Sequence, residues 1–224
     1  MERVTIPELL DTDAGTADEI ATSLRDLRHI NQWFGGIGTT QSMIERVAEK
    51  AQTKSFSMLE VASGPGFVPN AVQERLRRGG VQVNTTLMDR AASHLNDGNG
   101  RGIRRVSGDA RALPFCANSF DLVSSCIFLH HLSPKEIVES INESLRVCRL
   151  AVLINDLVRH PLHLALVYAG LPLFRSRLTW HDAPASVRQA YTIQEMRELL
   201  QRTPAREIVI RRHYLFRMGI IVWK

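Results

Sequence analysis

The chain has 224 residues, of which 44% are hydrophobic and 23% charged, and this composition excludes disorder as the dominant state. A chain of this length buries roughly 70% of its unfolded surface, so we expect a single domain, residues 1–224, around one core. The formal net charge of +5 is mild and the arginines are scattered. We therefore expect no nucleic-acid partner.

Membrane, secretory and disulfide-rich classes are disfavoured as well. No run of about 18 uncharged apolar residues occurs, and residues 1–19 lack the basic and then apolar layout of a secretory leader. The three cysteines are widely spaced and form no C-x-x-C pair, which predicts neither a disulfide framework nor a metal site. An odd, low cysteine count is typical of a reducing compartment, so we expect a cytoplasmic protein.

Strand-like and helix-like segments alternate from residue 55 onward. Apolar or β-branched runs predict strands at residues 55–62, 81–88, 103–106, 120–128, 150–157, 207–214 and 218–224. Apolar residues at helical spacing predict helices at residues 68–78, 134–146 and 193–202. This order predicts an α/β fold, a Rossmann-like seven-stranded sheet with helices on both faces. Only a few residues join the last two strands, so they must form an antiparallel hairpin.

Two segments fall outside this alternation. Residues 1–54 carry helical patterning, with Ile20, Leu24, Leu27 and Ile30 spaced by three or four. Residues 158–190 interrupt the pattern between a strand and a helix. We expect the first segment to be a helical cover and the second to be a lid insert over a site at the sheet edge.

A glycine-containing turn follows the first predicted strand, in the segment MLEVASGPGF of residues 58–67. Glycines at Gly64 and Gly66 allow close approach of the backbone to a ligand, and the helix that follows offers free N–H groups. Such a turn is weak evidence alone, because any tight strand-to-helix connection favours glycine.

Carboxylates follow the next two strands. Asp89 ends the second strand about 25 residues after the glycine turn, where a carboxylate can accept hydrogen bonds from both hydroxyls of a ribose. Asp89 would serve equally as the N-cap of a short helix over residues 91–95. Asp109 follows the third strand. Because the carboxyl ends of parallel strands share one edge, we expect these groups to face one crevice.

Four ordered motifs together give a specific resemblance. LEVASGPG, LMD ending at Asp89, GDARALPF at residues 108–115 and SFDLVSSCIFLHHL at residues 119–132 resemble the class I S-adenosylmethionine (SAM)-dependent methyltransferases, over roughly residues 55–157. The ubiquinone/menaquinone-type small-molecule branch is the most similar. Ala62 stands where that family's loop usually has its first glycine.

The resemblance implies a role for each motif in holding SAM. Glu60 would lie near the methionine amino group, and Asp89 would hold the ribose hydroxyls. Asp109 and Ala110 would frame the adenine. The remaining residues that we assign to the cofactor are Ala62, Gly64, Gly66, Arg90, Ser125 and Cys126.

Candidate catalytic residues follow the fourth and fifth strands. His130 resembles in position the base of plant-type O-methyltransferases, and His131 is adjacent to it. A hydroxyl nucleophile gains from a base whose pKa lies near the operating pH. Asp156 ends the fifth strand, where it could orient a histidine or bind a substrate hydroxyl. Packing or capping at the strand ends is the structural alternative for all three.

The insert adds two further candidates, His160 and His181, which we expect near the substrate. His160-x-x-His163 would place two imidazoles on one helical face, but no third ligand is clear. We expect no metal.

The predicted function is transfer of a methyl group from SAM to the oxygen or carbon of a small, hydrophobic, hydroxylated acceptor, aromatic or polyketide-like. The alternative is a catalytically inactive SAM-binding partner or regulatory protein. A nicotinamide-dependent reductase is disfavoured, because the loop A-S-G-P-G-F departs from G-x-G-x-x-G and no Tyr-x-x-x-Lys pair occurs. The apolar insert and modest charge also disfavour a macromolecular acceptor such as RNA.

Overall fold

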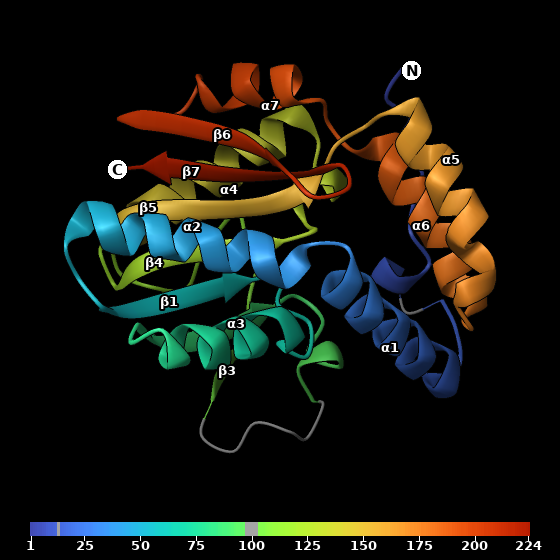
Figure 1. Cartoon of the computed structure of the whole chain (residues 1–224), viewed down its shortest axis with the longest axis horizontal. Helices are drawn as coiled ribbons and strands as arrows, with labels where there is room; N and C mark the ends of the chain where they lie inside the picture. Colours follow the sequence, from blue (N-terminus) through green and yellow to red (C-terminus); the bar gives the residue numbers. More distant parts are fainter. Residues whose placement is uncertain (13, 97–102) are drawn as a thin grey trace.

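A computed structural model describes residues 1–12, 14–96 and 103–224, and within them seven strands form one sheet in the order β3-β2-β1-β4-β5-β7-β6 (Figure 1). The strands are β1 (Ser55–Val61), β2 (Gln82–Asp89), β3 (Arg104–Ser107), β4 (Phe120–Cys126), β5 (Cys148–Leu157), β6 (Glu207–His213) and β7 (Arg217–Trp223). Neighbours from β3 to β5 pair in parallel, whereas β7 pairs antiparallel with both β5 and β6. The predicted sheet and its reversed last strand are confirmed.

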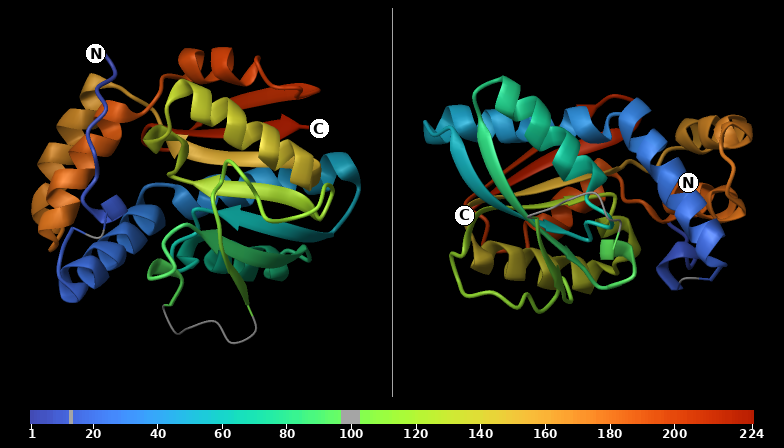
Figure 2. Two further views of the ribbon diagram at one scale, coloured as in Figure 1. Left: turned by 180° about the vertical axis from the view of Figure 1, so that it is seen from behind. Right: turned by 90° about the horizontal axis from the view of Figure 1, so that it is seen from below.

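Helices cover both faces of this sheet. The helices α2 (Gly36–Ala51) and α3 (Phe67–Arg78) pack on one face, and α4 (Pro134–Val147) and α7 (Ile193–Leu200) pack on the other, which gives three layers (Figure 2). Each face has its own cluster of buried apolar side chains. The sheet is therefore covered on both sides, as its near-continuous apolar strands require.

A further helical group stands beside the carboxyl ends of β1 and β5 (Figure 1). It consists of α1 (Ala17–Trp33), α5 (Pro161–Gly170) and α6 (Arg177–Gln189), with α6 packed on both α1 and α5. Residues 1–33 and 158–190 thus meet on the side where parallel strands present their ligands, whereas the rest of the expected N-terminal cover, α2, packs on a face of the sheet. In the part of the chain that the structure describes, no helix has the length and apolar character needed to span a membrane.

Local sequence signals account for where the helices begin. Capping boxes at Thr16, Ser133 and Thr192 start α1, α4 and α7, each closed by a glutamate three residues later. The expected short helix over residues 91–95 does not form; a single turn of 3-10 helix, His94–Asn96, takes its place. The Asp89 side chain accepts a hydrogen bond from Ala91 N–H, a turn-forming contact that competes with helix.

Candidate functional site

A cavity of about 410 Å³ lies where the carboxyl ends of β1, β2 and β4 face α1. This volume falls within the range of small-molecule sites. The strand ends contribute Glu60, Ala62, Gly64, Asp89, Asp109, Ala110 and Cys126, and α1 contributes Leu24, Leu27, Arg28 and Asn31. The N-terminal segment adds Glu8, Leu10 and Asp11, and the turn after β4 adds Phe128, His131 and Leu132.

The glycine turn bends through three left-handed residues. Ala62, Gly64 and Gly66 have φ values of 52°, 50° and 83°, a region that costs an alanine energy but not a glycine. Ala62 therefore holds the conformation that the family's usual glycine would adopt there. A Cβ on Gly66 would lie 2.5 Å from Leu87 Cδ1, so close packing of α3 on β2 also requires glycine at that position.

The carboxylate of Asp89 ties the end of β2 to this turn. Its Oδ2 accepts a hydrogen bond from Gly64 N–H at 2.8 Å, and its Oδ1 accepts one from Ala91 N–H at 3.0 Å. Asp89 thus orders the local backbone and also lines the cavity. It caps no helix over residues 91–95, because that helix does not form. Arg90, directly after it, also lines the cavity.

Asp109 lies on the cavity wall as an ion pair with Arg111, at 2.8 Å between Oδ2 and Nη2. Hydrogen bonds from Arg111 lower the pKa of Asp109 to about 2, so the group is ionised at neutral pH. Ala110 is buried beside it and lines the cavity.

Glu60 is the least satisfied group of the cavity wall. It is 1% exposed, and its Oε2 has no hydrogen-bond partner. Burial raises the pKa of this carboxyl to about 7, against a smaller opposing effect of the Ser124 hydroxyl. A buried carboxylate without a partner is costly, so this wall favours a cationic ligand group.

The end of β4 offers backbone and a neutral thiol. Cys126 lines the cavity, whereas Ser125 is buried and is not among the lining residues. Burial raises the pKa of Cys126 to about 12. The sulfur is therefore a thiol at neutral pH, and the geometry gives it no part as a nucleophile.

A buried arginine fixes α1 over the cavity. Arg217, at the start of β7, is 1% exposed. Its guanidinium donates hydrogen bonds to Asn31 Oδ1 at 3.0 Å, Asn155 Oδ1 at 3.2 Å and Phe34 O at 3.1 Å. Since Asn31 lines the cavity, this contact links the sheet directly to the cavity's helical wall.

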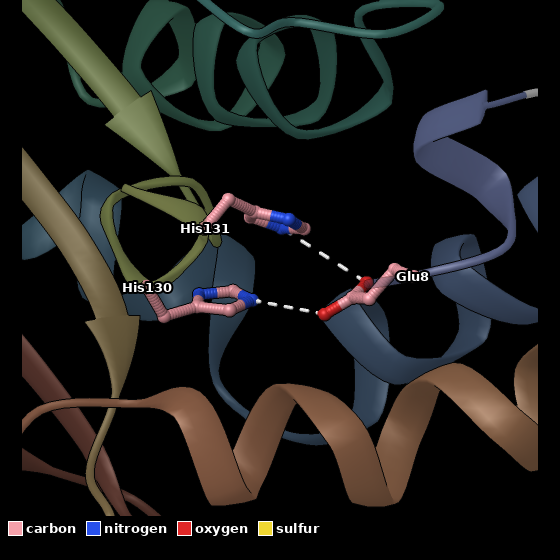
Figure 3. Close-up of side chains that lie close together, drawn as sticks. All are labelled: Glu8, His130 and His131. Carbon is pink, nitrogen blue, oxygen red and sulfur yellow. Dashed lines mark ion pairs between the residues drawn. The ribbon is translucent and has the colours of Figure 1, made fainter. Parts of the chain in front are cut away.

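A histidine–carboxylate cluster lies beyond the end of β4. His130 and His131, on the 3-10 turn η3 (Leu129–His131), both face Glu8 of the N-terminal segment (Figure 3). Their Nε2 atoms lie 3.6 Å and 3.9 Å from the Glu8 carboxylate. Asp156 lies 2.7 Å from Nδ1 of His130, and Asp11 lies 2.8 Å from Nδ1 of His131. Each imidazole therefore stands between two carboxylates.

The charged groups of this cluster shift one another's pKa values. Burial alone would lower the pKa of His130, but Asp156 and Glu8 outweigh it and raise that pKa to about 10. Burial would likewise raise the pKa values of Glu8 and Asp156, yet the neighbouring imidazoles hold both below their usual range. His131 lines the cavity, whereas His130 and Asp156 lie behind it with 1% exposure each.

The chain brings Glu8 to this position by anchoring its extended N-terminal segment on α6. Asp182 accepts hydrogen bonds from Leu9 N–H and Leu10 N–H. Glu8 Oε1 accepts from Ser186 Oγ at 2.6 Å and from Gln189 Nε2 at 2.7 Å. Sequence reasoning missed Glu8 and Asp11, because a non-periodic segment carries no signal for a contact 120 residues away.

The two histidines predicted from the insert lie outside the residues that line the cavity. His160 caps α5, where its Nδ1 accepts a hydrogen bond from Leu162 N–H, and its ring stacks on Phe216. His181 pairs with Asp182 at 2.8 Å. Of the insert, Ser186 alone is among the lining residues within the described ranges. The insert thus packs mainly behind α1 and the N-terminal segment.

Comparison with known proteins gives a family match. Residues 58–150 match a family model described as "Methyltransferase domain". These residues run from β1 through β4 and α4 into β5 and include the glycine turn, Asp89 and Asp109. No curated protein matches the chain in sequence.

Solved structures share the fold over most of the chain. The plantazolicin methyltransferase BpumL, crystallised with a monoazolic desmethylPZN analog and SAH, has a TM-score of 0.73 at 13% identity, with 97% of this chain and 94% of that chain covered. A SAM-dependent methyltransferase from Aquifex aeolicus has a TM-score of 0.55 at 16% identity, with 80% and 88% covered. The CurJ carbon methyltransferase has a TM-score of 0.58 at 12% identity, with 82% and 54% covered. At such identities these likenesses show the fold alone.

Proposed function

We propose that this chain, which contains a methyltransferase domain of the class I, Rossmann-like, SAM-dependent kind, moves a methyl group from SAM to a small, hydrophobic, hydroxylated acceptor. The observation that carries the proposal is the composition of one cavity. It joins the glycine turn, Asp89 and an unpaired Glu60 carboxylate to a wall formed by Glu8 and His131.

The residues on the strand side fit SAM. The methionine part of SAM carries an ammonium, and Glu60 offers a buried carboxylate oxygen without a partner. The open left-handed turn at Gly64, where an added Cβ would meet nothing within 4 Å, lets a ligand approach the backbone. Asp89 would hold the ribose hydroxyls, and Asp109 with Ala110 would frame the adenine.

When bound, SAM supplies a sulfonium methyl group that is already activated for displacement, so the chain's own task is to place the acceptor and handle its proton. His131 lies on the cavity wall with Glu8 and Asp11. We assign the acceptor's hydroxyl or enol to this wall. His130 and Asp156 act from behind as positioning residues, because they contact the wall and not the cavity.

The apolar residues of the cavity support a hydrophobic acceptor. Leu10, Leu24, Leu27, Phe128 and Leu132 contribute to its lining. A flat aromatic or polyketide-like molecule would bury this surface, and burial of apolar area favours binding. BpumL, which shares this fold, was crystallised with a monoazolic desmethylPZN analog and SAH, so the fold accommodates an organic ligand together with SAH.

The test is incubation of the protein with SAM and a panel of phenols, pyrones and hydroxyquinones, followed by mass spectrometry. We expect one acceptor class to gain a methyl group with equimolar formation of S-adenosylhomocysteine (SAH). A protein that binds SAM but methylates no member of a broad panel would favour the catalytically inactive alternative.

SAM affinity is expected to rise with pH between about pH 6 and pH 8. The pKa of Glu60 is raised by burial to about 7, so the carboxyl is mostly neutral at the lower pH and ionised at the higher. Only the ionised form attracts an ammonium, so affinity should change by up to about tenfold per pH unit below that pKa. Calorimetric titration at several pH values measures this dependence.

The matched variant is Glu60→Gln, which keeps the shape of the side chain and removes its titration. We expect weaker binding with a flat pH profile from this variant. A wild-type affinity that is independent of pH over the same range would show that Glu60 does not meet the cofactor's ammonium.

A further inference from the structure

Glu8, His130 and His131 bring three metal-ligating atoms within 4.8 Å of one another. Figure 3 shows both imidazoles pointing at one carboxylate. The three residues come from two segments 120 positions apart, so the tertiary fold and not a local motif builds the group.

The hydrogen bonds of the imidazoles occupy Nδ1 of each ring, so Nε2 is the nitrogen that a metal would bind as it displaces the proton there. Nδ1 of His130 is engaged by Asp156, and Nδ1 of His131 is engaged by Asp11. A carboxylate on Nδ1 fixes the tautomer, orients the ring and increases the basicity of Nε2, and it is the usual outer partner of a metal-bound histidine. Both Nε2 atoms are thereby directed to Glu8.

Buried Nε2 of His130 has no hydrogen-bond partner, although the residue is 1% exposed. Its separation of 3.6 Å from Glu8 Oε1 is too long for a hydrogen bond and too short to hold a water between the two atoms. Two ligands at about 2.1 Å from a tetrahedral metal ion lie about 3.4 Å apart. The separations of 3.6 Å, from His130 Nε2 to Glu8 Oε1, and 3.9 Å, from His131 Nε2 to Glu8 Oε2, exceed that value by a few tenths of an ångström and end on the two different carboxylate oxygens.

The charge of the cluster also suits a divalent cation. Glu8, Asp11 and Asp156 place three carboxylates around two imidazoles, and none of the three forms an ion pair with lysine or arginine among the described residues. Nitrogen and carboxylate ligands in a His₂Glu set favour Zn²⁺, with Co²⁺ and Ni²⁺ as close substitutes, over Mg²⁺ and Ca²⁺, which prefer oxygen alone.

We propose that Glu8, His130 and His131 form a binding site for one transition-metal dication of the Zn²⁺ class, with its open coordination position facing the cavity. Glu8 and His131 both line the cavity, so the fourth ligand, water or an acceptor oxygen, would enter from that side. Metal binding at this site does not depend on the proposed function. A contact between the metal and the acceptor does depend on it.

The experiment is calorimetric titration of chelator-treated protein with Zn²⁺ alone, without SAM or acceptor, at neutral pH. We expect one site with a micromolar or lower Kd, and no comparable binding of Mg²⁺. Co²⁺ in place of Zn²⁺ should give visible absorption bands that Zn²⁺ abolishes.

Glu8→Gln and His131→Gln should each weaken the site by at least tenfold and remove the Co²⁺ bands. Glutamine at position 8 retains an acceptor oxygen for Ser186 and Gln189, so this variant is expected to fold. His29→Gln, on the exposed side of α1, and His160→Gln control for adventitious binding at other histidines, and both should keep the Zn²⁺ site.

Absence of a Zn²⁺ site in the wild-type protein, or equal Zn²⁺ binding by Glu8→Gln, overturns the proposal. Such a result would mean that a proton on His130 Nε2, and not a metal ion, lies between His130 and Glu8. SAM titrated separately into the same preparation shows whether the proposed function holds independently of this result.

Discussion

Replacement of His131 by alanine is expected to lower kcat about 10²–10⁴-fold while SAM affinity stays close to that of the wild type. His131 lies on the cavity wall beside Glu8 and Asp11, and among the described residues no hydrogen bond joins it to the glycine turn or to Asp89. The loss would therefore fall on the acceptor's reacting group and not on the cofactor. Steady-state kinetics with a methylated acceptor, together with SAM titration, separates the two effects.

His29→Ala is the matched control for this variant, because His29 is an exposed histidine that stacks on Trp33 and does not line the cavity. We expect wild-type kinetics from it. If His131→Ala lost SAM affinity and turnover in equal measure, the residue would be a structural support of the cavity. If it kept full turnover, the acceptor would lie against another wall.

Replacement of Arg217 by methionine should lower the free energy of unfolding by about 3–6 kcal/mol. The buried guanidinium donates to Asn31, Asn155 and Phe34, and leaving each of these three acceptors without its donor costs about 1–2 kcal/mol. Methionine fills much of the volume but leaves these acceptors without a donor. Denaturant unfolding followed by circular dichroism measures the difference.

Arg217→Lys provides the comparison, because it keeps the charge and loses the planar fork of donors. We expect an intermediate stability from it. Because Arg217 holds α1 through Asn31, the methionine variant should also bind SAM more weakly at temperatures where it remains folded. A stability loss below about 1 kcal/mol in Arg217→Met would show that water or other donors replace the guanidinium.

The sheet was largely predictable because its signals are local. The central strands are buried apolar runs ended by turns, whereas the edge strands β3 and β6 have no fully buried residue. The sequence pattern predicted every strand to within two residues of its observed bounds. The antiparallel hairpin followed from the short connection between β6 and β7. The short helix expected over residues 91–95 was wrong, because the Asp89 carboxylate forms a local turn with Ala91 N–H.

The strand-end groups were predictable for a topological reason. Parallel strands deliver their carboxyl ends to one edge, so Glu60, Asp89, Asp109 and Cys126 all reach the same cavity wall. Their roles toward SAM stay predictions. The left-handed φ of Ala62 shows why glycine is the usual residue of that family at this position, because a residue with a Cβ pays an energetic cost for this conformation.

The histidine–carboxylate cluster around Glu8 was not predictable in the same way. Glu8 lies in an extended segment without periodicity, and its contacts with Ser186 and Gln189 join residues about 180 positions apart. The histidines of the insert satisfy local capping and pairing instead: His160 caps α5 and His181 pairs with Asp182. Histidine is a common catalytic residue type. Whether a given histidine reaches a cavity, however, depends on tertiary packing that no local sequence pattern encodes.

The central claim, that this cavity is a SAM site, is tested most directly by calorimetric titration of the purified protein with SAM, SAH and NADPH, with Asp89→Ala measured alongside. Our account predicts one micromolar site for SAM and SAH, no binding of NADPH, and a loss of about 1–3 kcal/mol in Asp89→Ala from missing charge-assisted hydrogen bonds. Binding of NADPH without SAM, or SAM binding that is unchanged by Asp89→Ala, would contradict it.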